Sequence, residues 1–168
     1  MDALARSAGI SRPTFYFYFA SKEALLIGVV QRALDNIVAA LDTALARGAD
    51  ETTPQALLRS VAAVWREHGP EMCAAIEIAP RSPVVRDQWA ALVEAPLEPL
   101  VSYVMEKGTV PEARDRAATI ALVGTLVWMT ERNFYRAVRA GLGPAELDAL
   151  ADRLATVLER TFGITDRK

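Results

Sequence analysis

Apolar residues recur every three or four positions over most of the chain, which is the period of an amphipathic α-helix. The clearest case is the range 21–47, which Gly48 ends and which should be about 40 Å long at 1.5 Å per residue. Its apolar stripe contains Leu26, Val30, Ile37 and Leu41. The pattern predicts one long helix that connects the start of the chain to the rest.

The same period predicts further helices after this one. Thr53 and Ser82 each precede a proline, which is typical of an N-cap followed by the first helical residue. We expect Gly69-Pro70 to break a helix, and Pro96 and Pro99 to kink or interrupt another. The expected helices cover 54–68, 71–79, 83–107, 112–140 and 146–162. No useful strand pattern occurs, so the sequence predicts an all-α fold of about eight helices.

The range 9–23 has the pattern of a helix-turn-helix. Gly9 can supply a tight turn after a short apolar helix, Ser11 is a good N-cap, and Pro13 suits a first turn. In the short helix that follows, Phe15 and Phe19 are four residues apart and can pack inward together. The remaining side chains are cationic or hydroxyl-bearing and could contact bases or phosphates: Arg12, Thr14, Tyr16, Tyr18 and Lys22.

This segment resembles the signature of the TetR family of one-component repressors, most closely its EthR-like branch. The features shared with the family are a Tyr-x-x-Phe and a Ser-Lys-Glu-x-Leu leading into a long helix. The similarity to the branch lies in the ranges 11–19 and 129–132. The resemblance implies a helix-turn-helix DNA-binding domain at 1–30 and a ligand-binding and dimerisation domain at 31–168. It implies duplex operator DNA as a partner, with Ser11 in the DNA-binding set, Arg12 and Thr14 near bases, Tyr16 and Lys22 on phosphate, and Tyr18 on either.

Two alternatives to DNA binding are open. The aromatic residues of this segment could form only a small helical core, with Arg12 and Lys22 as solvated charges. The family also places a complete first helix before the motif, whereas Met1 falls within the expected second helix. The alternative function is therefore a homodimeric helical ligand-binding protein without effective DNA binding.

Charge is unevenly distributed along the chain. The net charge over 168 residues is −2, whereas residues 1–22 contain three cations and one anion, a balance of +2 that leaves −4 for the remainder. A basic end on an acidic body fits a protein that contacts DNA with one end. The longest nearly apolar run, 117–129, is too short to span a bilayer, and the N-terminus has no signal-peptide pattern. We expect a cytoplasmic protein that makes no membrane contact.

Enzyme chemistry has little support in the sequence. Cys73 and His68 are the only residues of their types, so one chain cannot form a disulfide, a histidine metal cluster or a catalytic triad. No glycine-rich phosphate loop occurs. Acidic pairs such as Asp148 and Asp152 are common on solvated helix faces. We expect no enzymatic activity, metal or cofactor.

Large adaptable side chains distributed over the body predict an apolar ligand pocket, although a well-filled core would use the same residues. The resemblance favours a pocket, since the family binds small effectors there and the EthR-like branch takes elongated apolar ones. Thr130 stands where that branch has an amide. The candidate ligand-binding residues are Trp65, Met72, Trp89, Tyr103, Trp128, Met129, Thr130, Asn133 and Phe134, with Thr130 and Asn133 as polar anchors.

The last two expected helices predict a homodimer. The range 112–140 is apolar around nearly its whole circumference, and 146–162 adds a second apolar stripe. Two such pairs facing each other would form a four-helix interface. The small residues Ala117, Ala121 and Gly124 would allow close approach.

Overall fold

A computed structural model describes residues 22–46 and 52–165, and within these ranges it contains helices and no strand. The predicted all-α fold is therefore confirmed. The two short 3-10 helices are η1 (Ala79–Arg81) and η2 (Pro111–Arg114). The α-helices are α3 (Lys22–Ala46), α4 (Pro54–Ile78), α5 (Pro83–Glu94), α6 (Leu97–Lys107), α7 (Arg116–Arg139) and α8 (Pro144–Phe162).

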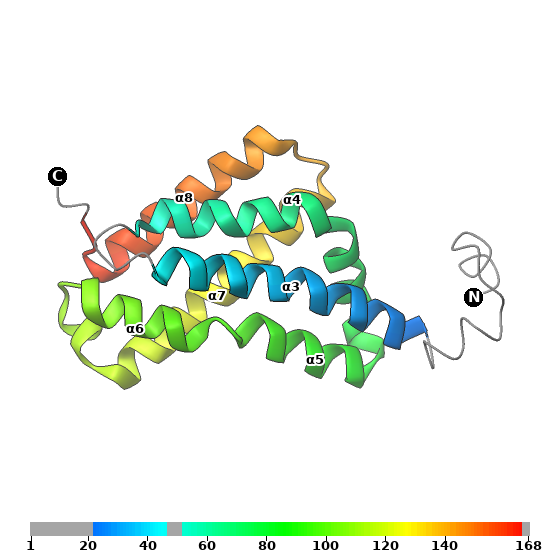
Figure 1. The fold of residues 1–168 in the computed structure, drawn as a ribbon, viewed down its shortest axis with the longest axis horizontal. Coiled ribbons are helices and arrows are strands. Elements are labelled where there is room, and N and C mark those ends of the chain that lie inside the picture. The colour runs from blue at the N-terminus through cyan, green and yellow to red at the C-terminus, as the bar shows by residue number, and fades with distance from the viewer. Residues whose placement is uncertain (1–21, 47–51, 166–168) are drawn as a thin grey trace.

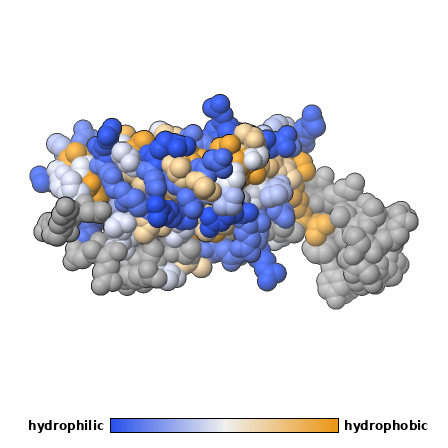
Figure 2. Space-filling model, turned by 90° about the horizontal axis from the view of Figure 1, so that it is seen from above, coloured by the Kyte–Doolittle hydropathy of each residue, from blue (hydrophilic) through white to orange (hydrophobic). Residues whose placement is uncertain are grey.

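Helix α4 is the centre of the bundle. It packs against α3 along one side and α8 along the other, while α5 and α7 also contact it. Figure 1 shows α7 running diagonally behind α3, with α5 and α6 in line along the lower edge. Polar side chains predominate on the face seen in Figure 2, with smaller apolar areas between them. Most large apolar side chains of the described helices are buried between them, whereas Val84, Ile120 and Val157 are among those that remain exposed.

The predicted break at Gly69-Pro70 is wrong, because α4 continues through it to Ile78. Pro70 lacks the N–H that would bond to the carbonyl of Arg66. Both residues lie on the exposed side of the helix, where water can reach that carbonyl. Gly69 is buried against Val138 of α7, so tertiary packing holds the helix continuous across the proline.

Proline also sets the other helix boundaries. Pro96 separates α5 from α6, whereas Pro99 falls in the first turn of α6, where no intrahelical donor is lost. The expected start of the next helix at 112 is wrong, because Pro111–Arg114 forms η2. Helix α7 begins after Asp115, whose Oδ1 accepts hydrogen bonds from the N–H groups of Ala117 and Ala118 at 2.9 and 3.3 Å.

Gly69 allows α4 and α7 to approach closely. A Cβ at this position would lie 2.9 Å from Cγ1 of Val138. Gly69→Ala should lower the free energy of unfolding by about 1–3 kcal/mol through overpacking, despite the better helix propensity of alanine. Gly28→Ala in α3 is the matched control, because nothing lies within 4 Å of its added Cβ. In urea unfolding, the control should raise the free energy of unfolding by about 0.5–1 kcal/mol. An equal rise for Gly69→Ala would contradict this packing role.

Candidate functional site

An apolar cavity of about 100 Å³ lies between the helices of the body. Among the described residues of its lining, only Thr130 and Glu131 have a hydroxyl or a charge, and the others are hydrocarbon, thioether or indole side chains. An apolar cavity of this order can take a small apolar group. It is partly open to the surface, so a longer alkyl chain can extend beyond it. Its lining consists of Ile37, Val38, Leu57, Leu58, Val61, Trp65, Met72, Trp89, Leu92, Val93, Pro96, Leu100, Val123, Leu126, Val127, Thr130, Glu131 and Leu158.

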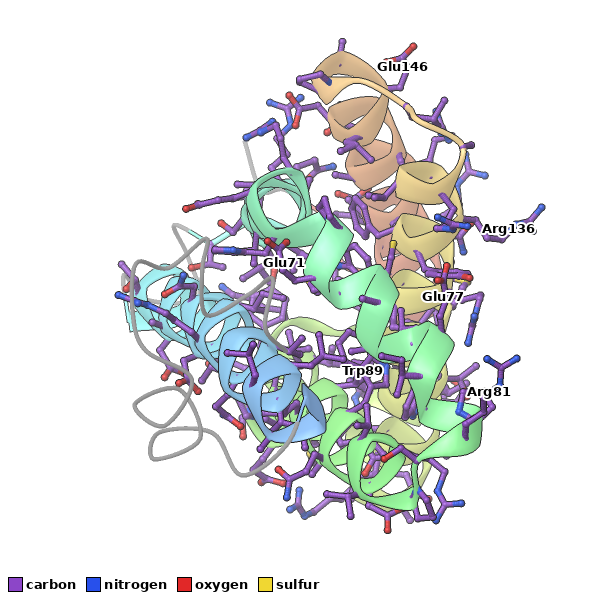
Figure 3. All side chains as sticks on the ribbon, turned by 90° about the vertical axis from the view of Figure 1, so that its right-hand side faces the viewer. Glu71, Glu77, Arg81, Trp89, Arg136 and Glu146 are labelled. Atoms are coloured by element: carbon purple, nitrogen blue, oxygen red, sulfur yellow. The ribbon has the colours of Figure 1, made fainter. Side chains whose placement is uncertain are left out.

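Helical spacing places these side chains on the sides of their helices that face the cavity. Trp65 and Met72 are seven residues apart on α4 and therefore share a face, and both are almost fully buried. On α7, Val123, Val127 and Thr130 follow at intervals of four and three residues. Trp89 enters from α5 and is labelled in Figure 3, where it lies in the interior between helices.

Helix α3 also reaches the cavity. Ile37 and Val38, in its C-terminal half, contribute to the lining. Near its N-terminal half, Leu26, Ile27 and Val30 pack against the core of the body. One continuous helix therefore runs from Lys22 to the cavity wall.

Glu131 is a buried carboxylate in this apolar lining, with a relative exposure of 5%. Its Oε1 accepts a hydrogen bond from Nε1 of Trp89 at 3.3 Å. Its Oε2 is buried and has no hydrogen-bond partner among the described residues; Nε of Arg132 lies 3.6 Å away. Burial raises the pKa of Glu131 above its usual range, opposed by the charge of Arg132 and the hydrogen bond from Trp89.

Sequence reasoning missed Glu131. Acidic residues on helices usually face water, so its type gave no signal. Its position in the sequence was a signal, because Glu131 falls on the apolar stripe of α7, four residues after Val127 and three before Phe134.

Four of the predicted ligand-binding residues line the cavity, and five do not. Trp65, Met72, Trp89 and Thr130 belong to the lining. Phe134 stacks on Trp65, with ring centroids 6.0 Å apart and an interplanar angle of 16°. Phe134 thus belongs to the core and can support Trp65 without contributing to the lining itself.

The other four predicted residues also lie outside the lining: Met129 packs against the core, and the other three donate side-chain hydrogen bonds elsewhere. The hydroxyl of buried Tyr103 donates to the carbonyl of Thr52 at 3.1 Å. Nε1 of Trp128 donates to Oε1 of Glu94 at 3.3 Å near the surface. Nδ2 of Asn133 donates to the carbonyl of Met129 at 2.8 Å, within one turn of α7. The amide expected to anchor a ligand is therefore bonded to its own helix.

The predicted DNA-binding residues Ser11, Arg12, Thr14, Tyr16 and Tyr18 lie outside the described residues. Lys22 is the first residue of α3. The predicted boundary at residue 30 falls within α3, which therefore belongs to both expected domains.

The described residues form neither a metal site nor a membrane span. The described part of the chain contains no group of three or more His, Cys, Asp or Glu side chains placed to hold a metal ion. In the same ranges, every helix is too short or too polar to cross a membrane.

Residues 1–29 match the family described as "Bacterial regulatory proteins, tetR family". The matched range includes the predicted helix-turn-helix and the first two turns of α3. It thus covers the segment whose residues carry the predicted DNA contacts.

Similar proteins extend this match into the body. The "HTH-type transcriptional regulator EthR" of Mycolicibacterium smegmatis is 30% identical over 162 residues, which cover 89% of this chain and 71% of the relative. EthR of Mycobacterium tuberculosis is 52% identical over 50 residues, 30% of this chain and 23% of the relative. The "HTH-type transcriptional activator FasR" of M. smegmatis is 44% identical over 45 residues, 27% of this chain and 20% of the relative.

Proposed function

Because the chain belongs to the TetR family of DNA-binding transcriptional regulators, in its EthR-like branch, we propose that it is a homodimeric repressor that a small apolar effector releases from its operator. The observation that carries this proposal is the apolar cavity whose wall includes Ile37 and Val38 of α3. A ligand there contacts the helix that continues from the DNA-binding segment. The name of FasR shows that a relative can activate, so a promoter-reporter fusion with and without the protein tests the sign of regulation.

The proposed switch acts through α3. Fifteen residues separate Lys22 from Ile37, so the cavity lies about 22 Å along the helix from its start. A ligand shifts an equilibrium only by its different affinity for two states, so the effector must favour one tilt of α3. Such a tilt would change the spacing of two recognition helices, and successive major grooves accept a spacing of about 34–36 Å.

Duplex binding should fall steeply with salt, because contacts to phosphates release counterions. In the proposed interface Arg12 and Thr14 contact bases, whereas Lys22 contacts phosphate. Arg12→Ala should weaken the free energy of binding to the operator by about 1–3 kcal/mol and relax the sequence preference of the protein. Lys22→Ala should weaken specific and random duplexes alike and reduce the salt slope by about one unit.

Fluorescence anisotropy with a duplex from the region upstream of the gene, and with a random duplex, measures both effects. Equal losses on the two duplexes for Arg12→Ala would contradict its role at bases. If neither duplex binds the wild-type protein, the alternative of a ligand-binding homodimer without DNA affinity replaces the repressor.

The proposed dimer interface is formed by α7 and α8. Ile120 and Val157 are large apolar side chains with exposures of 37% and 40%. Ala117 and Ala121 are also exposed, and nothing lies within 4 Å of a Cβ added to Gly124. These small and apolar positions leave room for a second copy to approach α7 closely.

Ile120→Arg should convert the dimer to a monomer, because pairing two copies would bury an unpaired cation on each side of the interface. Light scattering at micromolar concentration measures the mass. Val84→Arg is the matched control, since Val84 is 62% exposed and lies on α5, outside the proposed interface. A monomeric wild-type protein, or a dimer that survives Ile120→Arg, would contradict this interface.

A further inference from the structure

We infer that Glu131 binds the head group of the effector, and that the effector is an apolar chain ending in a protonated amine. The inference rests on the proposed ligand-binding role of the cavity and names the chemical class of its ligand. It starts from an unusual feature of the lining. Of the eighteen described residues that line the cavity, seventeen are uncharged, and the remaining one is a carboxylate that is almost fully buried.

The two oxygens of this carboxylate have different surroundings. Oε1 accepts the hydrogen bond from the indole N–H of Trp89, which fixes the carboxylate at the junction of α5 and α7. Oε2 is buried and accepts no hydrogen bond from any described residue. A buried acceptor without a partner costs free energy, and a ligand that donates to it recovers that cost on binding. Oε2 itself has almost no surface open to the cavity. A donor head group reaches it when the Glu131 carboxylate turns toward the ligand, and the hydrogen bond then formed recovers this cost.

The charged side chain beside Glu131 does not supply the missing hydrogen bond. Nε of Arg132 is 3.6 Å from Oε2, beyond hydrogen-bond distance, and 55% of the Arg132 side chain is exposed. The guanidinium group also lies over the ring of Tyr135, 5.1 Å from its centroid. Arg132 therefore lowers the cost of the buried charge from the surface side but does not satisfy Oε2.

An ammonium group fits Oε2 better than other head groups. It has three donors and a positive charge, and hydrogen bonds between ionised partners are about twice as strong as neutral ones. An alcohol can donate only a neutral hydrogen bond. A carboxylate ligand would place a second negative charge beside Glu131 in an apolar space, which is unfavourable. Thr130 adds a hydroxyl to the lining, and the hydrocarbon walls take the alkyl chain.

Isothermal titration calorimetry of the whole protein with n-octylamine, n-octanol and octanoate at neutral pH tests the inference. The three probes share one chain length and differ in the head group. We expect n-octylamine to bind at least roughly tenfold more tightly than n-octanol, with octanoate weakest. Because this series uses the wild-type protein, its result does not depend on whether a variant folds.

Glu131→Gln removes the charge and keeps the shape, and it should abolish the preference for the amine over the alcohol. Glu94→Gln is the matched control: Glu94 is an exposed carboxylate on α5 that accepts from Trp128 and does not line the cavity. The control should leave the preference unchanged, which separates local recognition from general attraction of a cation to an acidic protein.

Equal affinities for n-octylamine and n-octanol, or an unchanged preference in Glu131→Gln, would overturn the role of Glu131 while the cavity remains a ligand site. If no probe binds, both this inference and effector release are overturned. DNA binding is measured separately and is unaffected by either outcome.

Discussion

Thr130→Trp should abolish binding of n-octyl probes to the cavity, lowering their affinity more than about a hundredfold. Thr130 lines a space of only about 100 Å³, so an indole ring at this position fills it. Each methylene group that no longer enters the cavity loses about 0.8 kcal/mol of transfer free energy, and every 1.4 kcal/mol is a factor of ten in affinity. Several excluded methylene groups therefore suffice for this loss.

Calorimetry measures this loss, and circular dichroism checks that the variant keeps its helices. Ala91→Trp is the matched control, because it adds the same ring at an exposed position of α5 outside the lining. Its affinity for the probes should equal that of the wild-type protein. Unchanged binding in Thr130→Trp would place the probes somewhere other than this cavity.

Phe134→Ala should lower the free energy of unfolding by about 3–5 kcal/mol, the usual loss for a truncated core phenylalanine. Phe134 has no exposed surface, and its ring stacks on Trp65. The truncation leaves a space behind Trp65, which then loses its support beside the cavity. Probe binding should weaken as well, because the wall that contains Trp65 is no longer held in place.

Urea unfolding at one fixed protein concentration measures the stability change, since dimerisation would make stability depend on concentration. Val84→Ala is the control: Val84 is 62% exposed, so its truncation should change the free energy by less than about 0.5 kcal/mol. A loss in Phe134→Ala as small as that of the control would contradict the core position of this ring.

The helices of the body could largely be predicted from the sequence, because their apolar period and caps are local features. The N-cap predicted at Thr53 is confirmed, with its Oγ1 accepting from the N–H of Ala56 at 3.2 Å. The largest error arose where long-range packing decides. At Gly69-Pro70 the contact with Val138, 69 residues away in the sequence, holds together a helix that local rules end.

The cavity could be predicted only in outline. Large aromatic side chains identify the interior, but the period of a helix does not say which of them face an empty space. Trp65 lines the cavity and Phe134 supports it from behind, although both looked equivalent in the sequence. The importance of Glu131 follows from the burial of its carboxylate, which depends on α5 packing over it.

The DNA contacts were predicted from the family resemblance, and their residues before α3 lie outside the described ranges. The match of residues 1–29 supports the family and the motif. The individual roles of Arg12, Thr14 and Lys22 stay predictions for the binding measurements above.

The most direct test of the proposed switch measures duplex affinity with and without a ligand in the cavity. Anisotropy of a labelled duplex from the upstream region is recorded at one salt concentration, in the absence and presence of saturating n-octylamine. Coupling between two sites usually amounts to about 5- to 150-fold, so we predict that the probe weakens duplex binding within this range, and that the duplex weakens probe binding by the same factor. Unchanged duplex affinity would contradict the switch, provided that a change in tryptophan fluorescence, to which Trp65 and Trp89 of the lining contribute, shows that the cavity is filled.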